Sequence, residues 1–247
     1  MRKTKSEDVS RNKVAVPALP QKQRQSIFDN AGNSGVHWMM YADALLNSAA
    51  LIRKKLLVFR RRLFRRRTDP QLAYYDSQAD VFLLLQGLAI ECLLKAKWVG
   101  DDGVLAENGR YVGIKGAGDH NLRQIAHQCQ RQFLDKQRQW RERGSRFTSD
   151  SQLEHIYSDK RQLIFSERQL FLLDQLSHYI LWAGRYPIPK KIEMFSPQNE
   201  SARVLRTVSV QDFRDIDRII KVIKRTMAPV EWVQLKNGEW VGKFSDE

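Results

Sequence analysis

The sequence predicts an all-α protein, an up-and-down bundle of four to five long helices with a small β-hairpin insertion and a C-terminal hairpin. Three observations predict this fold. Apolar residues recur every three or four positions over several long segments, as they do in helices with one buried face. Asn-Gly pairs flanked by apolar residues mark two hairpins between or after these segments. Hydrophobic residues make up 42% of the 247, which suffices for a core and excludes global disorder.

The first two predicted helices, at about residues 37–67 and 70–98, are separated by a short polar junction. Thr68-Asp69-Pro70 is expected to end the first helix and begin the second, because Asp caps a helix and Pro suits its first turn. The second helix is apolar on most faces between residues 81 and 94. We therefore expect it to occupy the centre of the bundle.

Capping residues, Gly and Pro predict the remaining elements. In chain order we expect a hairpin or ordered loop over 100–118, a third helix capped by Asp119, a loop with a short helix over 144–160, a fourth long helix over 162–183 and a terminal hairpin from Val230. Ser209-Val210-Gln211-Asp212 resembles a capping box and predicts the start of a last helix before that hairpin.

Residues 1–33 are polar and aperiodic, so we expect a flexible basic N-terminal arm, followed by a single helical domain with a C-terminal extension over 34–247. No apolar run approaches the roughly 20 residues of a membrane span, and the N-terminus lacks the pattern of a secretory signal. Cys92 and Cys129 suit neither a disulfide framework nor a zinc site. We expect a cytoplasmic protein with no transmembrane segment, no metal and no cofactor.

The net charge of +14 is concentrated in the first 67 residues, where sixteen Lys and Arg face four Asp and Glu. Its densest part holds nine cations and no acid: Arg53, Lys54, Lys55, Arg60, Arg61, Arg62, Arg65, Arg66 and Arg67. Such a run repels itself unless an anion neutralises it. We predict that these side chains bind the phosphates of RNA or another polyanion. The alternatives are an acidic protein partner, an acidic membrane surface, and no specific role.

Charged residues inside the second predicted helix give the candidate catalytic site, since the familiar catalytic motifs are missing. Glu91 and Lys95 lie four apart in an apolar segment and need partners. One interpretation is an ion pair on an exposed stripe. In the other, Glu91 anchors a polar cluster with His120 and Arg185 at helix ends. The candidate catalytic residues are then His120, Arg185, Glu91 and Lys95, because RNA cleavage needs a proton carrier and cations for the phosphate.

Three segments in order, LLLQGLAIECLLKA, GDHNL and YILWAGRYPIP, resemble the HEPN superfamily of prokaryotic α-helical domains, over about residues 38–189. The resemblance implies a homodimeric bundle that binds or cuts RNA without a metal ion in defence, toxin–antitoxin or stress systems. It also implies an alternative, a catalytically inactive module that pairs with a nucleotidyltransferase or another effector. Active members carry an Arg followed by four to six residues and a His, and none of the five His has an Arg at that spacing.

Overall fold

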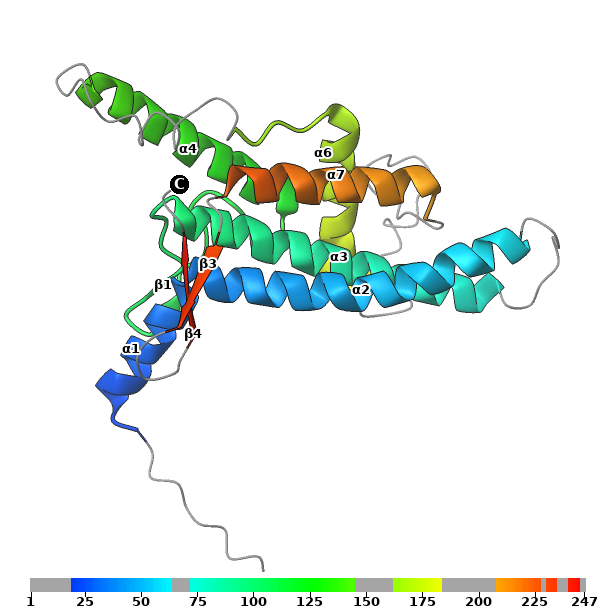
Figure 1. Cartoon of the computed structure of the whole chain (residues 1–247), viewed down its shortest axis with the longest axis horizontal. Helices are drawn as coiled ribbons and strands as arrows, with labels where there is room; N and C mark the ends of the chain where they lie inside the picture. The colour runs from blue at the N-terminus through cyan, green and yellow to red at the C-terminus, as the bar shows by residue number, and fades with distance from the viewer. Residues whose placement is uncertain are drawn as a thin grey trace, which may run out of the picture.

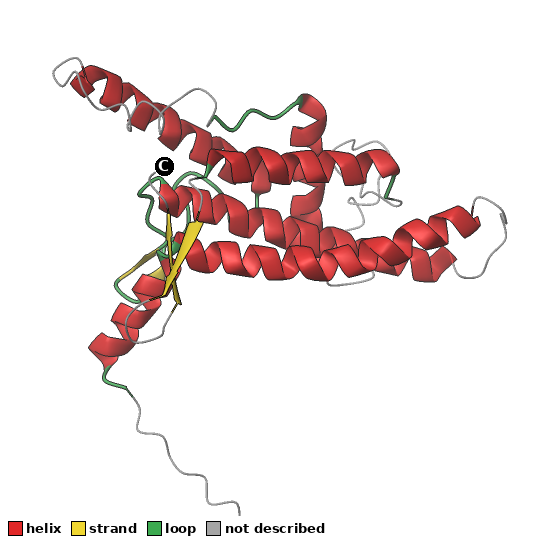
Figure 2. Cartoon of the chain, in the orientation of Figure 1, coloured by secondary structure: helices red, strands yellow, loops and turns green. Residues whose placement is uncertain are grey.

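The computed structural model describes residues 19–63, 72–144, 162–183, 208–227, 230–234 and 240–244, which are mostly helical (Figure 2). The helices are α1 (Gln21–Gly32), α2 (Gly35–Leu63), α3 (Leu72–Gly100), α4 (Leu122–Gly144), α6 (Glu167–His178) and α7 (Val210–Thr226), with a π-helix, η2 (Tyr179–Ala183), continuing α6. Two antiparallel hairpins pair β1 (Ala106–Glu107) with β2 (Arg110–Tyr111), and β3 (Val230–Gln234) with β4 (Trp240–Phe244). The all-α prediction and both predicted hairpins are confirmed.

Helix α3 lies at the centre, where it packs against α2, α4, α6, η2 and α7, as its apolar sequence predicts. Leu83, Ile90 and Leu94 are fully buried there. Figure 1 shows α2, α3 and α7 side by side with α6 running across them, so α6 breaks the expected up-and-down order. Gly87 permits this crossing, because a Cβ atom there would lie 2.9 Å from Ile180 of η2. No helix in the described part of the chain is long and apolar enough to cross a membrane.

The arm expected over residues 1–33 is not irregular throughout, because residues 21–32 form α1 against the first hairpin. The side chain of Asn33 accepts hydrogen bonds from the backbone N–H groups of Leu105 and Ala106, at 2.8 and 3.1 Å, and donates one to the carbonyl of Ala106. Asp29 accepts another from the backbone of Gly109. Since α1 has no buried residue, these polar contacts hold it, and apolar periodicity could not have predicted it.

The fourth predicted helix begins five residues later than expected. Residues 162–166 are not helical, and the backbone N–H of Leu163 donates to Gln130 of α4 at 2.6 Å. Ser166 then caps α6 through a capping box with Gln169. This cap determines where α6 begins. The capping residues are visible in the sequence, but apolar spacing alone places the start of the helix too early. The loop expected over 144–160 lies, beyond Gly144, outside the described residues.

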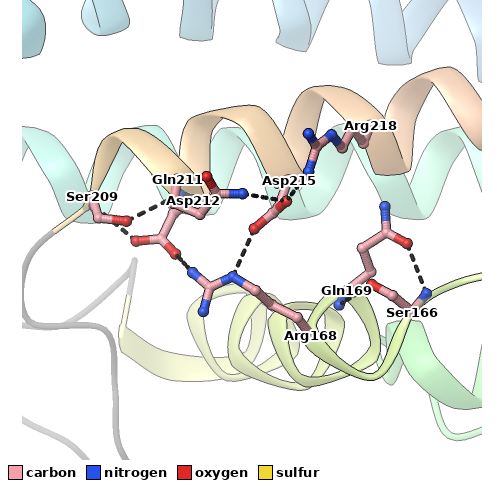
Figure 3. Close-up of polar contacts among 8 residues, drawn as sticks. All are labelled: Ser166, Arg168, Gln169, Ser209, Gln211, Asp212, Asp215 and Arg218. Carbon is pink, nitrogen blue, oxygen red and sulfur yellow. Dashed lines mark hydrogen bonds and ion pairs between the residues drawn. The ribbon is translucent and has the colours of Figure 1, made fainter.

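The first turns of α6 and α7 are joined by Arg168, as Figure 3 shows. Ser209 caps α7 through the predicted capping box with Asp212. Arg168 donates to Asp212 and to Asp215, each at 2.7 Å, and both carboxylates are buried. Burial by itself raises the pKa of Asp215, but hydrogen bonds from Arg168 and Gln211 outweigh it and hold the pKa below its ordinary value of 3.8. The cation therefore satisfies two buried charges at once.

We predict that Arg168→Met lowers the free energy of unfolding by about 2 kcal/mol at neutral pH, because both carboxylates lose a charged donor. We expect less than for a fully buried pair, since over half of the Arg168 side chain is exposed. The stabilisation by Asp215 is complete above pH 3.8 and is lost as pH falls through the lower folded-state pKa. Urea denaturation at neutral pH and at pH values below 3.8 should therefore show that the free energies of unfolding of the wild type and Arg168→Met converge in acid.

The matched control for this experiment is Arg214→Met on α7, because Arg214 is exposed and its side chain makes no hydrogen bond or ion pair with a described residue. Its effect should stay within about 0.5 kcal/mol. Equal effects of the two variants would show that Arg168 does not join the helices.

Candidate functional site

The buried carboxylate of Glu91 lies at the centre of the candidate site. Its Oε1 accepts a hydrogen bond from Lys95 Nζ at 2.5 Å, and its Oε2 lies 2.8 Å from His120 Nδ1. Glu91 is 4% exposed and Lys95 is 7% exposed. Glu91 and Lys95 form the expected ion pair between residues four apart. The interpretation that this pair lies on an exposed stripe of the helix is wrong, because other elements cover both side chains. The structure brings His120 to Glu91, as the second interpretation predicts.

Aromatic rings from two further elements surround Lys95. Its Nζ lies 5.0 Å from the ring centre of Trp38 on α2 and 5.2 Å from that of Tyr111 on β2. Burial by itself lowers the pKa of Lys95, but the carboxylate of Glu91 more than compensates and raises it above 10.5, with a further contribution from Tyr111. Lys95 therefore stays charged, held by one carboxylate and two ring faces.

His120 enters the site from the loop that precedes α4. Its φ of 66° lies in the left-handed region, a conformation that is uncommon for residues other than Gly. The side chain of Asn121 accepts from the backbone N–H of Gln124 at 3.0 Å, so Asn121 caps α4 in place of the expected Asp119. About a third of the His120 side chain is exposed. One side of the ring thus meets a buried carboxylate while part of it reaches solvent.

The contact between Glu91 and His120 determines what the site can do chemically. An ionised carboxylate only accepts hydrogen bonds, so the proton of the neutral ring must sit on Nδ1. The other ring nitrogen, Nε2, is then a proton acceptor, and Glu91 stabilises the imidazolium that forms when it takes a proton. Lys95 neutralises Glu91. The cluster is therefore an acid–base pair with a counter-ion, and Lys95 is not available as the expected phosphate-binding catalyst.

Neither cysteine adds a nucleophile to this site. Burial, and secondarily the carboxylate of Glu91, raise the pKa of the Cys92 thiol to about 11. Burial raises the pKa of Cys129 to about 12. Both side chains are therefore protonated near neutral pH and unreactive.

A groove of about 650 Å³ lies between α4 and residues 163–170. Its lining includes Asn121, His127, Phe165 and Leu170. This volume is in the range of small-molecule sites. None of Glu91, Lys95 and His120 is among its lining residues, so the groove borders the acid–base cluster at Asn121 without containing it.

The basic run divides into structural and exposed side chains. Arg53 donates to both carboxylate oxygens of Asp217 on α7, at 2.7 and 2.8 Å, and lies over the ring of Phe213. It therefore joins α2 to α7. Lys54 and Lys55 are exposed, and Arg60 is partly buried.

The other predicted site residues can be placed only in part. Arg61 and Arg62 belong to the last turn of α2. Arg65, Arg66, Arg67 and Arg185 lie outside the described residues. Of the four residues of the predicted catalytic cluster, the structure therefore describes three, Glu91, Lys95 and His120.

An exposed strip of α2 runs from Tyr41 to Lys55 of the basic run. Tyr41, Ala44, Ser48, Leu51 and Lys55 recur at three or four residues and are all exposed. With a rise of 1.5 Å per residue, the seventeen steps along the helix from Trp38 to Lys55 span about 25 Å. A ligand that touches both the cluster and the basic run must therefore be an extended one.

Sequence reasoning missed the aromatic part of the site. Trp38 lies within the range of the first predicted helix, and Tyr111 lies within that of the predicted hairpin. Their approach to Lys95 joins three elements that are distant in sequence, and local spacing carries no signal for it.

A comparison with protein-family models finds no match to this chain, and comparisons with curated proteins and with solved structures find none either.

Proposed function

We propose that this protein is an RNA-binding, HEPN-like helical protein of a defence, toxin–antitoxin or stress system, and a metal-independent endoribonuclease with His120 as its acid–base group. The observation that carries the proposal is the hydrogen bond between His120 Nδ1 and the buried carboxylate of Glu91. It leaves the other nitrogen of a partly exposed imidazole available for proton transfer.

RNA supplies its own nucleophile, so this arrangement needs no reactive Ser or Cys. His120 Nε2 takes the proton from a 2′-hydroxyl, whose oxygen attacks the adjacent phosphorus. The bond to the 5′-oxygen breaks, and the protonated ring returns a proton to that leaving oxygen. The products are a 2′,3′-cyclic phosphate and a free 5′-hydroxyl. Glu91 supports the charged ring during the exchange.

Binding is assigned to the exposed cations of the basic run, with Lys54 and Lys55 as its exposed members among the described side chains. Phosphate contacts of this kind carry affinity without sequence information. These cations belong to the same helix, α2, as Trp38, which contacts Lys95 of the cluster.

The alternative is a catalytically inactive module that pairs with a nucleotidyltransferase or another effector, and one observation favours it. Met40, Tyr41, Leu51 and Val58 of α2 are each about half exposed or more. Apolar side chains gathered on one helix suit a protein partner, either an effector or the second copy of a homodimer.

We predict that His120→Ala lowers the rate of RNA cleavage by a factor of about 10² to 10⁴, because the proton carrier is lost. Gel analysis of a labelled RNA should show 2′,3′-cyclic phosphate ends. An RNA with a single 2′-deoxy residue at the cleavage position should not be cut there, and a chelator should not change the rate.

The matched control is His127→Ala, since His127 is an exposed histidine on α4 whose side chain makes no hydrogen bond or ion pair with a described residue. It should cleave as the wild type does. Unchanged cleavage by His120→Ala would exclude His120 as the acid–base group, and absence of cleavage by the wild type would favour the inactive module.

Salt dependence tests the RNA-binding surface separately from cleavage. Replacing Lys54 and Lys55 with Gln should make the logarithmic dependence of affinity on salt shallower by about 1.5 units for single-stranded RNA, because two phosphate contacts are removed. The matched double variant replaces Arg131 and Arg138, two exposed cations of α4. Equal slopes for the two variants would contradict binding along α2.

A further inference from the structure

Tyr111 is an aromatic residue that the proposed function does not yet use. Its side chain is fixed on one side by Lys95, which lies 5.2 Å from the ring centre, and its backbone is fixed by pairing with Ala106. Gly113 lies beside the ring, because a Cβ there would lie 3.6 Å from Cε1 of the ring, an ordinary van der Waals distance. Even so, 41% of the residue is exposed. The ring is thus held in place with a large part of its surface open.

Two cations lie beside this ring in the sequence. Arg110 and Lys115 are both exposed, and neither makes a hydrogen bond or an ion pair through its side chain with another residue in the described part of the chain. Exposed cations next to an exposed ring are typical of single-strand binding sites, where bases stack on rings and phosphates contact cations.

Tyr111 is connected to His120 by contacts on its buried side. These run from Tyr111 through Lys95 and Glu91 to His120. Gly113 lies near both the Tyr111 ring and Asp119, because a Cβ there would lie 3.6 Å from ring Cε1 and 3.3 Å from Asp119 Oδ1, and Asp119 directly precedes His120. A nucleotide on the open surface of the ring is therefore next to the loop that carries the acid–base group.

We propose that Tyr111 is a stacking platform for an unpaired base, with Arg110 and Lys115 contacting the adjacent phosphates, so that the site takes single-stranded RNA. This proposal rests on the proposed function, and it restricts the substrate from RNA in general to single-stranded RNA. The ring can accept a base only from a strand whose bases are unstacked, because an A-form duplex covers the faces of its bases. Lys95 is a positioning residue here, since it touches the inner side of the ring and not the nucleic acid.

Photocrosslinking tests the stacking directly, and it needs no cleavage. A single-stranded RNA containing 5-bromouracil is irradiated with the full chain carrying His120→Ala, which prevents turnover, and the crosslinked residue is identified by mass spectrometry. The expected crosslink is at Tyr111. Crosslinks confined to other residues would overturn the platform.

Affinity for the same RNA gives the second measurement. Tyr111→Ala should bind at least about fivefold more weakly, whereas Tyr111→Phe, which keeps the ring, should bind as the unaltered chain does. Val112→Ala is the matched control, because Val112 is the next residue and is more than half exposed. A duplex of the same sequence should show no difference between Tyr111→Ala and the unaltered chain. Circular dichroism checks that each variant is folded.

The outcomes separate the two proposals. If the chain binds single-stranded RNA and Tyr111→Ala binds equally well, the platform is overturned while RNA binding stands. If the chain binds RNA only as a duplex, the platform is again overturned. If it binds neither form, the proposed function fails, and the platform fails with it.

Discussion

The carboxylate of Glu91 accepts hydrogen bonds on both of its oxygens inside an otherwise apolar helix, from Lys95 on one side and from His120 on the other. A buried charge without partners would be very costly, so the elements that carry these partners must stay in place. Through His120 the carboxylate fixes the loop before α4. Through Lys95 it fixes Trp38 on α2 and Tyr111 on β2. One ionised group thus connects the central helix to three other parts of the chain.

Charge elsewhere in the molecule also serves to join helices. Arg53 of α2 pairs with Asp217 of α7, and Arg168 of α6 bridges Asp212 and Asp215 at the start of α7. A net charge of +14 therefore overstates the surface available to an anion, because some of the most prominent cations are already engaged. What the basic run offers a polyanion, among its described side chains, is above all Lys54 and Lys55.

Apolar periodicity predicted the central position of α3, and the polar residues Ser209 and Asp212 predicted the capping box of α7. Periodicity failed for α1, which buries no residue and is held by contacts such as those of Asn33 with the first hairpin. In the candidate site, too, local sequence spacing predicted one part and tertiary packing determines the other. The spacing of Glu91 and Lys95 was visible, whereas the burial of the pair by Trp38 and Tyr111 depends on tertiary packing. Arg53 counted as one cation among nine because its carboxylate partner lies 164 residues away.

The protonation state of the His120 ring is the most direct test of the central claim that Glu91 orients an acid–base histidine. Nitrogen NMR of protein labelled in its histidines, at alkaline pH where the imidazole is neutral, reports which ring nitrogen carries the proton. The His120 signals are assigned by their loss in His120→Ala. We expect a proton on Nδ1 in the wild type and a shift toward the Nε2–H form in Glu91→Gln. A proton on Nε2 in the wild type, or identical signals in the Glu91→Gln variant, would contradict the claim.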